Sequence, residues 1–148
     1  MIPEFDAAGN LPPGIHEATL EEVRRRYASN LHRRRLFAGL ERAINDLQAA
    51  GCRRLYINGS FVTAIKTPHD FDCCWDPDGI DLDHLPPELG GHLRSRRAAQ
   101  QARYMGDILP ADAPVDALQT RCLEFFQQDK HTRAAKGIIV IALEDAVR

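Results

Sequence analysis

The sequence predicts an α+β (α/β) fold in which a mixed β-sheet of about four strands is flanked by helices. Apolar residues recur at helical spacing between positions 36 and 47, and residues 138–143 form a continuous apolar run rich in β-branched side chains. The 148 residues suit one domain, which we take to span 1–148 and to open with an extended N-terminal arm over residues 1–18.

The N-terminal arm is rich in proline and glycine, which favours an irregular path over the surface. Its candidate anchors are Phe5, Leu11 and Ile15. The arm lacks the apolar core of a signal peptide, and the longest apolar run, at 138–143, is too short to cross a bilayer. We therefore expect a soluble, cytoplasmic protein without membrane contact.

Two helices should precede the first strand. Thr19 and Glu22 have the spacing of a capping box, which predicts that one helix begins near Leu20. The apolar periodicity predicts a second helix over residues 33–50, which Gly51 should end.

The remaining elements follow from apolar runs and from the breaks between them. Strands are predicted at residues 53–58, 70–75, 104–109 and 136–143. A helical turn is predicted at 60–66, and longer helices at 93–103 and 118–128.

The net charge of −2 gives no bulk attraction to nucleic acid, so a polyanion would need a local patch. The arginine triplets at 24–26 and 33–35 resemble such a patch, but each spreads around a helix, and ion pairs with nearby glutamates are the alternative. A second group of arginines could contact a triphosphate or an RNA backbone: Arg94, Arg96, Arg97 and Arg103.

The four cysteines have no spacing typical of a zinc site or a redox motif. Cys73 and Cys74 should point to opposite faces if they lie in a strand. Buried, reduced thiols are therefore expected, with a redox or metal role as the alternative.

The stretch that indicates chemistry is Gly59-Ser60, followed after nine residues by Asp70-Phe71-Asp72. A glycine at the end of a strand lets the backbone approach a ligand closely, and the following serine offers a hydroxyl and an amide to a phosphate oxygen. Carboxylates two residues apart on a strand face the same side. Such a pair can bind Mg²⁺, which prefers oxygen ligands and commonly bridges to substrate phosphates.

The apolar Ile57 with Gly59-Ser60 and Asp70-Phe71-Asp72 resembles the signature of the DNA polymerase β-type nucleotidyltransferase superfamily. Its small, minimal nucleotidyltransferase members are the most similar. Residues 5–16 and 125–137 also look similar to a group of uncharacterised bacterial proteins that carry this signature. One departure is plain, because Phe61 and Val62 follow Ser60 where small members often have a basic residue.

The resemblance implies a nucleotidyltransferase-like fold and a role for each motif residue. Gly59 and Ser60 would bind the phosphates of a nucleoside triphosphate such as ATP, and Asp70 and Asp72 would be catalytic ligands of two Mg²⁺ ions, with Mn²⁺ as a substitute. Lys66 and His69 are the candidates for supplying the missing positive charge to the nucleotide.

The superfamily normally has a third carboxylate, which would bind metal and help activate the acceptor hydroxyl. Asp107 is the leading candidate for this catalytic and metal-binding role, because it lies within an apolar strand where an unpaired charge is costly. Asp116 has similar neighbours but lies beyond two prolines, and the chain could also lack a third ligand.

The leading hypothesis is an enzyme that transfers a nucleoside monophosphate from a triphosphate to a hydroxyl of a protein or an RNA such as tRNA. The resemblance further implies a bacterial toxin–antitoxin or phage-defence system, with a cognate toxin or antitoxin as partner. The alternative is a catalytically degenerate nucleotidyltransferase fold that acts as a non-enzymatic antitoxin or partner-binding protein.

Overall fold

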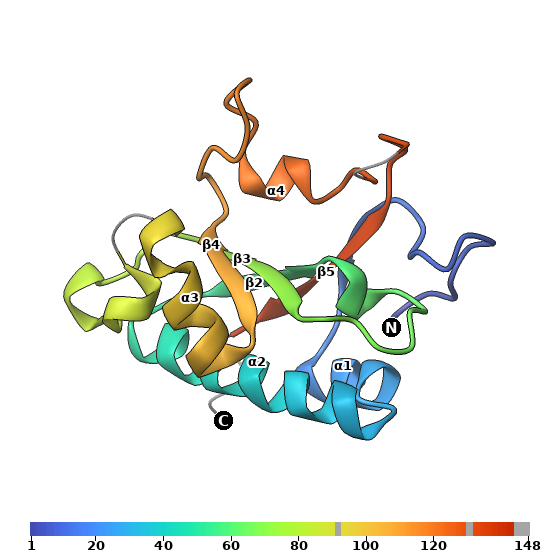
Figure 1. The fold of residues 1–148 in the computed structure, drawn as a ribbon, viewed down its shortest axis with the longest axis horizontal. Helices are drawn as coiled ribbons and strands as arrows, with labels where there is room; N and C mark the ends of the chain where they lie inside the picture. Colours follow the sequence, from blue (N-terminus) through green and yellow to red (C-terminus); the bar gives the residue numbers. More distant parts are fainter. Residues whose placement is uncertain (91–92, 130–131, 144–148) are drawn as a thin grey trace.

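A computed structural model describes residues 1–90, 93–129 and 132–143 of the chain. It shows a mixed α/β architecture built on a five-stranded sheet with the strand order β1-β5-β2-β3-β4. Helices α1 and α2 lie on one face of the sheet, α4 lies over the other, and α3 lies beside the edge strand β4 (Figure 1).

The sheet is mixed, as predicted. Its strands are β1 (Gly14–Glu17), β2 (Arg54–Asn58), β3 (Phe71–Trp75), β4 (Gly106–Pro110) and β5 (Gly137–Ala142). The outer pairs β1–β5 and β3–β4 are parallel, whereas β2 is antiparallel to both of its neighbours. The parallel β3–β4 pair is joined by the crossover through α3, which is the usual connection for parallel strands.

The prediction of about four strands missed β1, which lies inside the predicted arm. Three of its four residues are exposed, so the strand has no apolar alternation that a sequence pattern could reveal. Backbone pairing with β5 creates it instead. The prediction that Ile15 anchors the arm is wrong, since Ile15 is 43% exposed; Ile2 and Leu11 are the buried anchors.

The α-helices of the described residues are α1 (Leu20–Tyr27), α2 (Leu31–Ala49), α3 (Leu93–Tyr104) and α4 (Cys122–Phe125). The predicted capping box is confirmed, because the Thr19 side chain accepts from the amide of Glu22, whose own side chain accepts from the amide of Thr19. Helix α2 begins two residues before the predicted start because Asn30 caps it, accepting from the amide of Arg33 at 2.8 Å.

Two predicted boundaries are wrong near the site. Tyr104 ends α3 instead of starting a strand, and Met105 turns the chain with φ 66° before β4 begins. Helix α4 is much shorter than the predicted 118–128, because the Asp116 carboxylate accepts the amides of Leu118 and Thr120 and closes a turn there.

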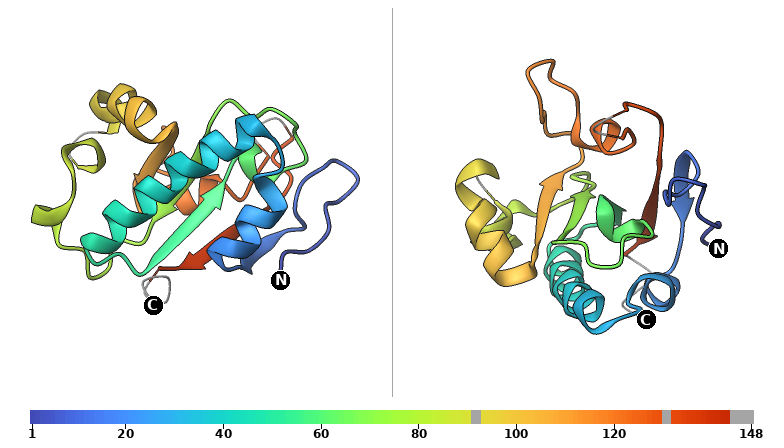
Figure 2. Two further views of the ribbon diagram at one scale, coloured as in Figure 1. Left: turned by 90° about the horizontal axis from the view of Figure 1, so that it is seen from below. Right: turned by 45° about the vertical axis from the view of Figure 1, so that its right-hand side comes forward.

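The main core lies between the sheet and α2, whose axis runs roughly along β2 (Figure 2). Leu36, Leu40 and Leu47 of α2 are fully buried, as the helical periodicity predicted. Gly39 lets α2 approach the end of α3, since a Cβ there would lie 1.7 Å from the Tyr104 carbonyl oxygen. Among the described residues, none of the helices has both the length and the apolar character needed to span a membrane.

Candidate metal and nucleotide site

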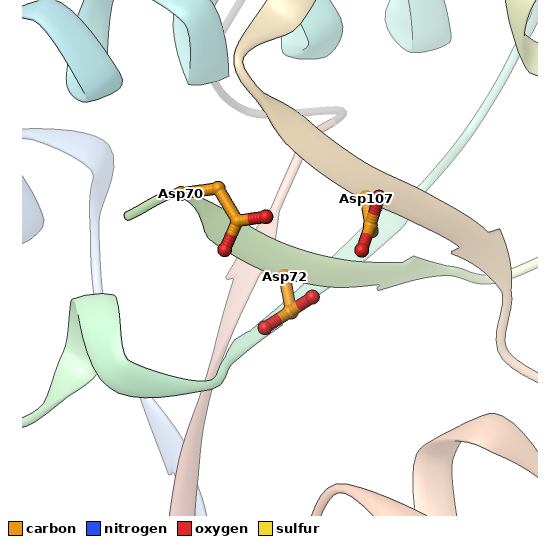
Figure 3. Close-up of side chains that lie close together, drawn as sticks. All are labelled: Asp70, Asp72 and Asp107. Carbon is orange, nitrogen blue, oxygen red and sulfur yellow. The ribbon is translucent and has the colours of Figure 1, made fainter. Parts of the chain in front are cut away.

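Three carboxylates converge on one side of β3 and β4 (Figure 3). Asp70 directly precedes β3, Asp72 lies within it, and Asp107 lies on β4 opposite Asp72 in the parallel register. Each offers one oxygen, and these atoms lie within 4.8 Å of one another. The alternation within β3 and the pairing of β3 with β4 therefore gather the three acids on one side of the sheet.

Asp116, the alternative third carboxylate, is not part of this cluster. Its carboxylate is engaged by the amides of Leu118 and Thr120, and these hydrogen bonds, first of all the one from Thr120, lower its pKa. Asp116 thus stabilises the loop before α4.

The acid cluster is held by two side chains of α3. Gln101 Nε2 donates to Asp70 Oδ2 at 2.9 Å and to Asp107 Oδ1 at 3.0 Å, so one amide bridges two of the acids. Arg97 Nε lies 3.3 Å from Asp107 Oδ1. Because residues four apart in a helix share a face, α3 presents both groups to the cluster.

Burial and mutual repulsion make two of these acids weaker than usual. Burial, followed by the charges of Asp70 and Asp107, raises the pKa of Asp72 to about 7, against the opposing charges of Lys136 and Arg97. Burial is also the main cause that raises the pKa of Asp70, and the Gln101 hydrogen bond opposes it. The cluster therefore holds more negative charge than its surroundings compensate, which is a property of cation sites.

Gly59 lies against this cluster at the end of β2. Its φ of 78° is in the region that favours glycine, and a Cβ there would lie 2.3 Å from Asp72 Oδ2. Ser60 then begins a 3₁₀ turn over Ser60–Val62, and within the described part of the chain its hydroxyl has no hydrogen-bond partner. Gly59 and Asp72, thirteen residues apart in sequence, are thus neighbours in space.

Arg33 fixes the loop that follows Ser60. Its side chain is only 3% exposed, and its guanidinium donates to the carbonyls of Tyr27, Phe61, Thr63 and Ile65. The possibility that Arg33 belongs to a nucleic-acid patch is therefore wrong. Its neighbours Arg34 and Arg35 are exposed.

The other arginines also have mainly structural contacts. Arg24 and Arg25 pair with Glu21, and Arg26 donates to carbonyls of the N-terminal arm. Arg103 pairs with Asp46 and Glu88. The side chain of Arg94 lies outside the described residues.

Lys66 and His69, the predicted nucleotide contacts, lie in the exposed loop between Ser60 and Asp70. The charge of His69 lowers the pKa of Asp70, which puts it within electrostatic reach of the cluster. No described contact joins the Lys66 side chain to the acids. The cations whose charges act on Asp72 are Lys136 and Arg97.

A cleft of about 710 Å³ opens beside the acids. Its lining includes Asp72, Arg97 and Asp107 and an apolar group with two aromatic rings, here called the aromatic wall: Leu109, Pro114, Val115, Phe125 and Phe126. This combination of charged and aromatic lining is suited to a ligand that carries both phosphate and a flat apolar group.

Sequence reasoning missed Gln101, Lys136 and the role of Arg97 in this site. The i, i+4 spacing of Arg97 and Gln101 on a predicted helix was a signal that both face the same way. Lys136 gave no such signal, because it reaches the site only through the position of β5.

A comparison with protein families gives one match, to the family described as "Family of unknown function (DUF6932)", over residues 3–142. The chain belongs to the DUF6932 family. The match to DUF6932 includes the N-terminal arm from residue 3 onward, the strands β1 to β5 and every residue of the candidate site. No curated protein and no solved structure gave a significant match to this DUF6932 chain.

Proposed function

We propose that this DUF6932 chain is a metal-dependent nucleotidyltransferase of the DNA polymerase β type. One observation carries the proposal: Gly59, which begins the glycine-serine turn, lies against the Asp72 carboxylate, and Asp72 is one of three acids with oxygens within 4.8 Å of one another. The order of the motif along the chain and its compact arrangement support the same reading.

The donor set fits Mg²⁺ or Mn²⁺. Asp70, Asp72 and Asp107 offer only carboxylate oxygens, the ligands that these hard cations prefer. Burial and then the charges of Asp70 and Asp107 raise the pKa of Asp72, and a divalent cation would favour its ionised form. One or two such ions would neutralise the charge of the phosphates and of the leaving pyrophosphate.

Gly59 and Ser60 would bind the triphosphate. Gly59 has no side chain to block the approach of a phosphate oxygen, and the Ser60 hydroxyl has no hydrogen-bond partner within the described residues. Arg97 and Lys136 supply positive charge near Asp72, in place of the basic residue that is missing after Ser60. Lys66 and His69 remain candidates for contacting the outer phosphate.

The reaction is an in-line displacement at the α-phosphorus of a nucleoside triphosphate. The oxygen of an acceptor hydroxyl forms the new bond to phosphorus, and the bond from that phosphorus to the bridging oxygen breaks and releases pyrophosphate. Asp107 accepts the hydroxyl proton, as the carboxylate that lies farthest along the sheet from Gly59 and Ser60.

The acceptor is proposed to be a hydroxyl of a protein or of tRNA, within a bacterial toxin–antitoxin or phage-defence pair. This setting rests on the resemblance to minimal nucleotidyltransferases. The open cleft with its aromatic wall supports a nucleotide as one of the two substrates.

The test is transfer of label from each of the four α-labelled nucleoside triphosphates to total bacterial protein or tRNA, with Mg²⁺ or Mn²⁺. Asp70→Asn, Asp72→Asn and Asp107→Asn should each lower transfer at least about 100-fold. Asp112→Asn is the control, because Asp112 is exposed and outside the cluster. Full activity in the Asp72 variant would exclude the assignment.

A second function, a non-enzymatic nucleotidyltransferase fold that binds a partner, is favoured by the environment of the residues after Ser60. Phe61 and Val62 are buried in the core, so a cationic side chain at either position could not reach a phosphate unless the loop rearranged. Titration calorimetry with nucleoside triphosphates and Mg²⁺ separates the two functions. Absence of binding under these conditions would favour the non-enzymatic one.

A further inference from the structure

Two cysteines far apart in sequence meet on the face of the sheet that carries the acids. The Sγ atoms of Cys74, in β3, and Cys122, the first residue of α4, lie 2.6 Å apart. Both residues are fully buried and, with Ala111, form a small cluster separate from the main core. Cys73, on the opposite face of β3, lies in the main core instead.

The backbone holds these two sulfurs in place. Cys74 is paired with Tyr56 of β2 on one side and with Leu109 of β4 on the other. The amide of Cys122 donates to the Ala113 carbonyl at 2.8 Å, and the next amide, from Leu123, donates to the Ala111 carbonyl. The pair therefore needs only a small shift to reach the bond length of a disulfide, about 2.05 Å.

We propose that Cys74 and Cys122 are a site of oxidative modification that forms a disulfide between β3 and α4. The bond would join β3, which carries Asp72, to α4, which ends at Phe125 (Figure 1). Asp72 and Phe125 both line the cleft. Oxidation would thus fix the aromatic wall of the cleft relative to the acids.

Because both thiols are buried, the oxidant is a small peroxide such as H₂O₂. The sulfur of one thiol attacks a peroxide oxygen, the O–O bond breaks, and a sulfenic acid and one water result. The second thiol then attacks the sulfenic sulfur, forms the S–S bond and releases a second water. Two thiols and one peroxide thus give one disulfide and two waters, and a dithiol reductant reverses the step.

The test counts free thiols in the intact chain. After brief treatment with H₂O₂, the protein is denatured in the presence of N-ethylmaleimide and analysed by mass spectrometry. Two labelled cysteines, Cys52 and Cys73, are expected, with a loss of two hydrogens and a peptide that links Cys74 to Cys122. The disulfide should also raise Tm by roughly 5–15 °C relative to protein reduced with dithiothreitol.

Cysteine-to-alanine variants identify which two cysteines form the disulfide. Cys73→Ala should keep it, whereas Cys74→Ala and Cys122→Ala should abolish it and leave Tm unchanged by oxidation. Four labelled thiols in oxidised wild-type protein would refute the proposal even if a variant fails to fold. Persistence of the link in Cys74→Ala would also refute it. Neither result depends on nucleotide transfer, so this proposal stands or falls separately from the proposed function.

Discussion

Gly59 and Asp72 are packed so closely that no side chain can be added between them. A Cβ on Gly59 would lie 2.3 Å from Asp72 Oδ2 and 3.1 Å from its Cγ. The contact joins the end of β2 to the beginning of β3, where Asn58 and Asp72 are paired. The absence of a side chain at Gly59 is therefore needed to leave room for the Asp72 carboxylate as well as for a ligand.

Gly59→Ala should destabilise the protein by about 2–4 kcal/mol, because it adds a clash with Asp72 to the strain of a positive φ. In the double variant Gly59→Ala/Asp72→Ala the clash is gone. Its loss of unfolding free energy should therefore be smaller than the sum of the two single-variant losses by about 1 kcal/mol or more. Urea denaturation measures the free energy of unfolding of the two single variants and the double variant. Gly90→Ala is the control, since no atom of the described residues lies within 4 Å of a Cβ there. Additive losses in the double variant would contradict the contact between Gly59 and Asp72.

Gln101→Ala should weaken binding of Mn²⁺ about 10–100-fold, because the amide that aligns Asp70 and Asp107 is lost. Titration calorimetry with the metal alone measures this effect without any requirement for turnover. Gln128→Ala, a change at an exposed site outside the cleft, should leave the affinity unchanged. Equal affinities in wild type and Gln101→Ala would show that the bridge does not organise the cluster.

The metal-free protein should lose stability as pH rises from about 4 to 7. Burial and the nearby acids raise the pKa of Asp72 in the folded chain from its ordinary value of 3.8 to about 7, so the folded state binds more protons than the unfolded state in that window. The free energy of unfolding therefore falls as pH rises, and the loss due to Asp72 is complete once the pH exceeds about 7.

Thermal denaturation in EDTA across this range measures the pH effect. Asp72→Asn should flatten the dependence, because asparagine does not ionise. Added Mg²⁺ should also flatten it, since the cation favours the ionised carboxylate. A metal-free wild type whose stability rises between pH 5 and 7 while that of Asp72→Asn does not would contradict the raised pKa.

Arg33→Met should cost about 3 kcal/mol, because it leaves the buried carbonyls of Phe61 and Thr63 without their donor. The neighbouring Arg34→Met removes an exposed charge from the same helix and should change stability by less than about 0.5 kcal/mol. Chemical denaturation compares the two. If both variants lose the same stability, Arg33 does not hold the loop after Ser60.

Several elements could be predicted because their signals are local. The capping box at Thr19, the periodicity of α2 and the apolar run of β5 each depend on residues close in sequence. Asp107 stood out as an acid between apolar residues, which the structure explains by its position beside Asp72. Strand β1 had no such signal, since its existence depends on pairing with a strand more than a hundred residues away.

The sequence by itself determined that Asp72 faces away from Phe71 and Cys73, and that Gly59 and Ser60 follow a buried strand, because the two-residue period of a strand is a local property. Only the tertiary structure decided which further residues join them. The crossover through α3 makes β4 pair in parallel with β3, which brings Asp107 beside Asp72 and turns Gln101 and Arg97 toward Asp107. Such pairing depends on the packing of segments distant in sequence, and no local pattern specifies it.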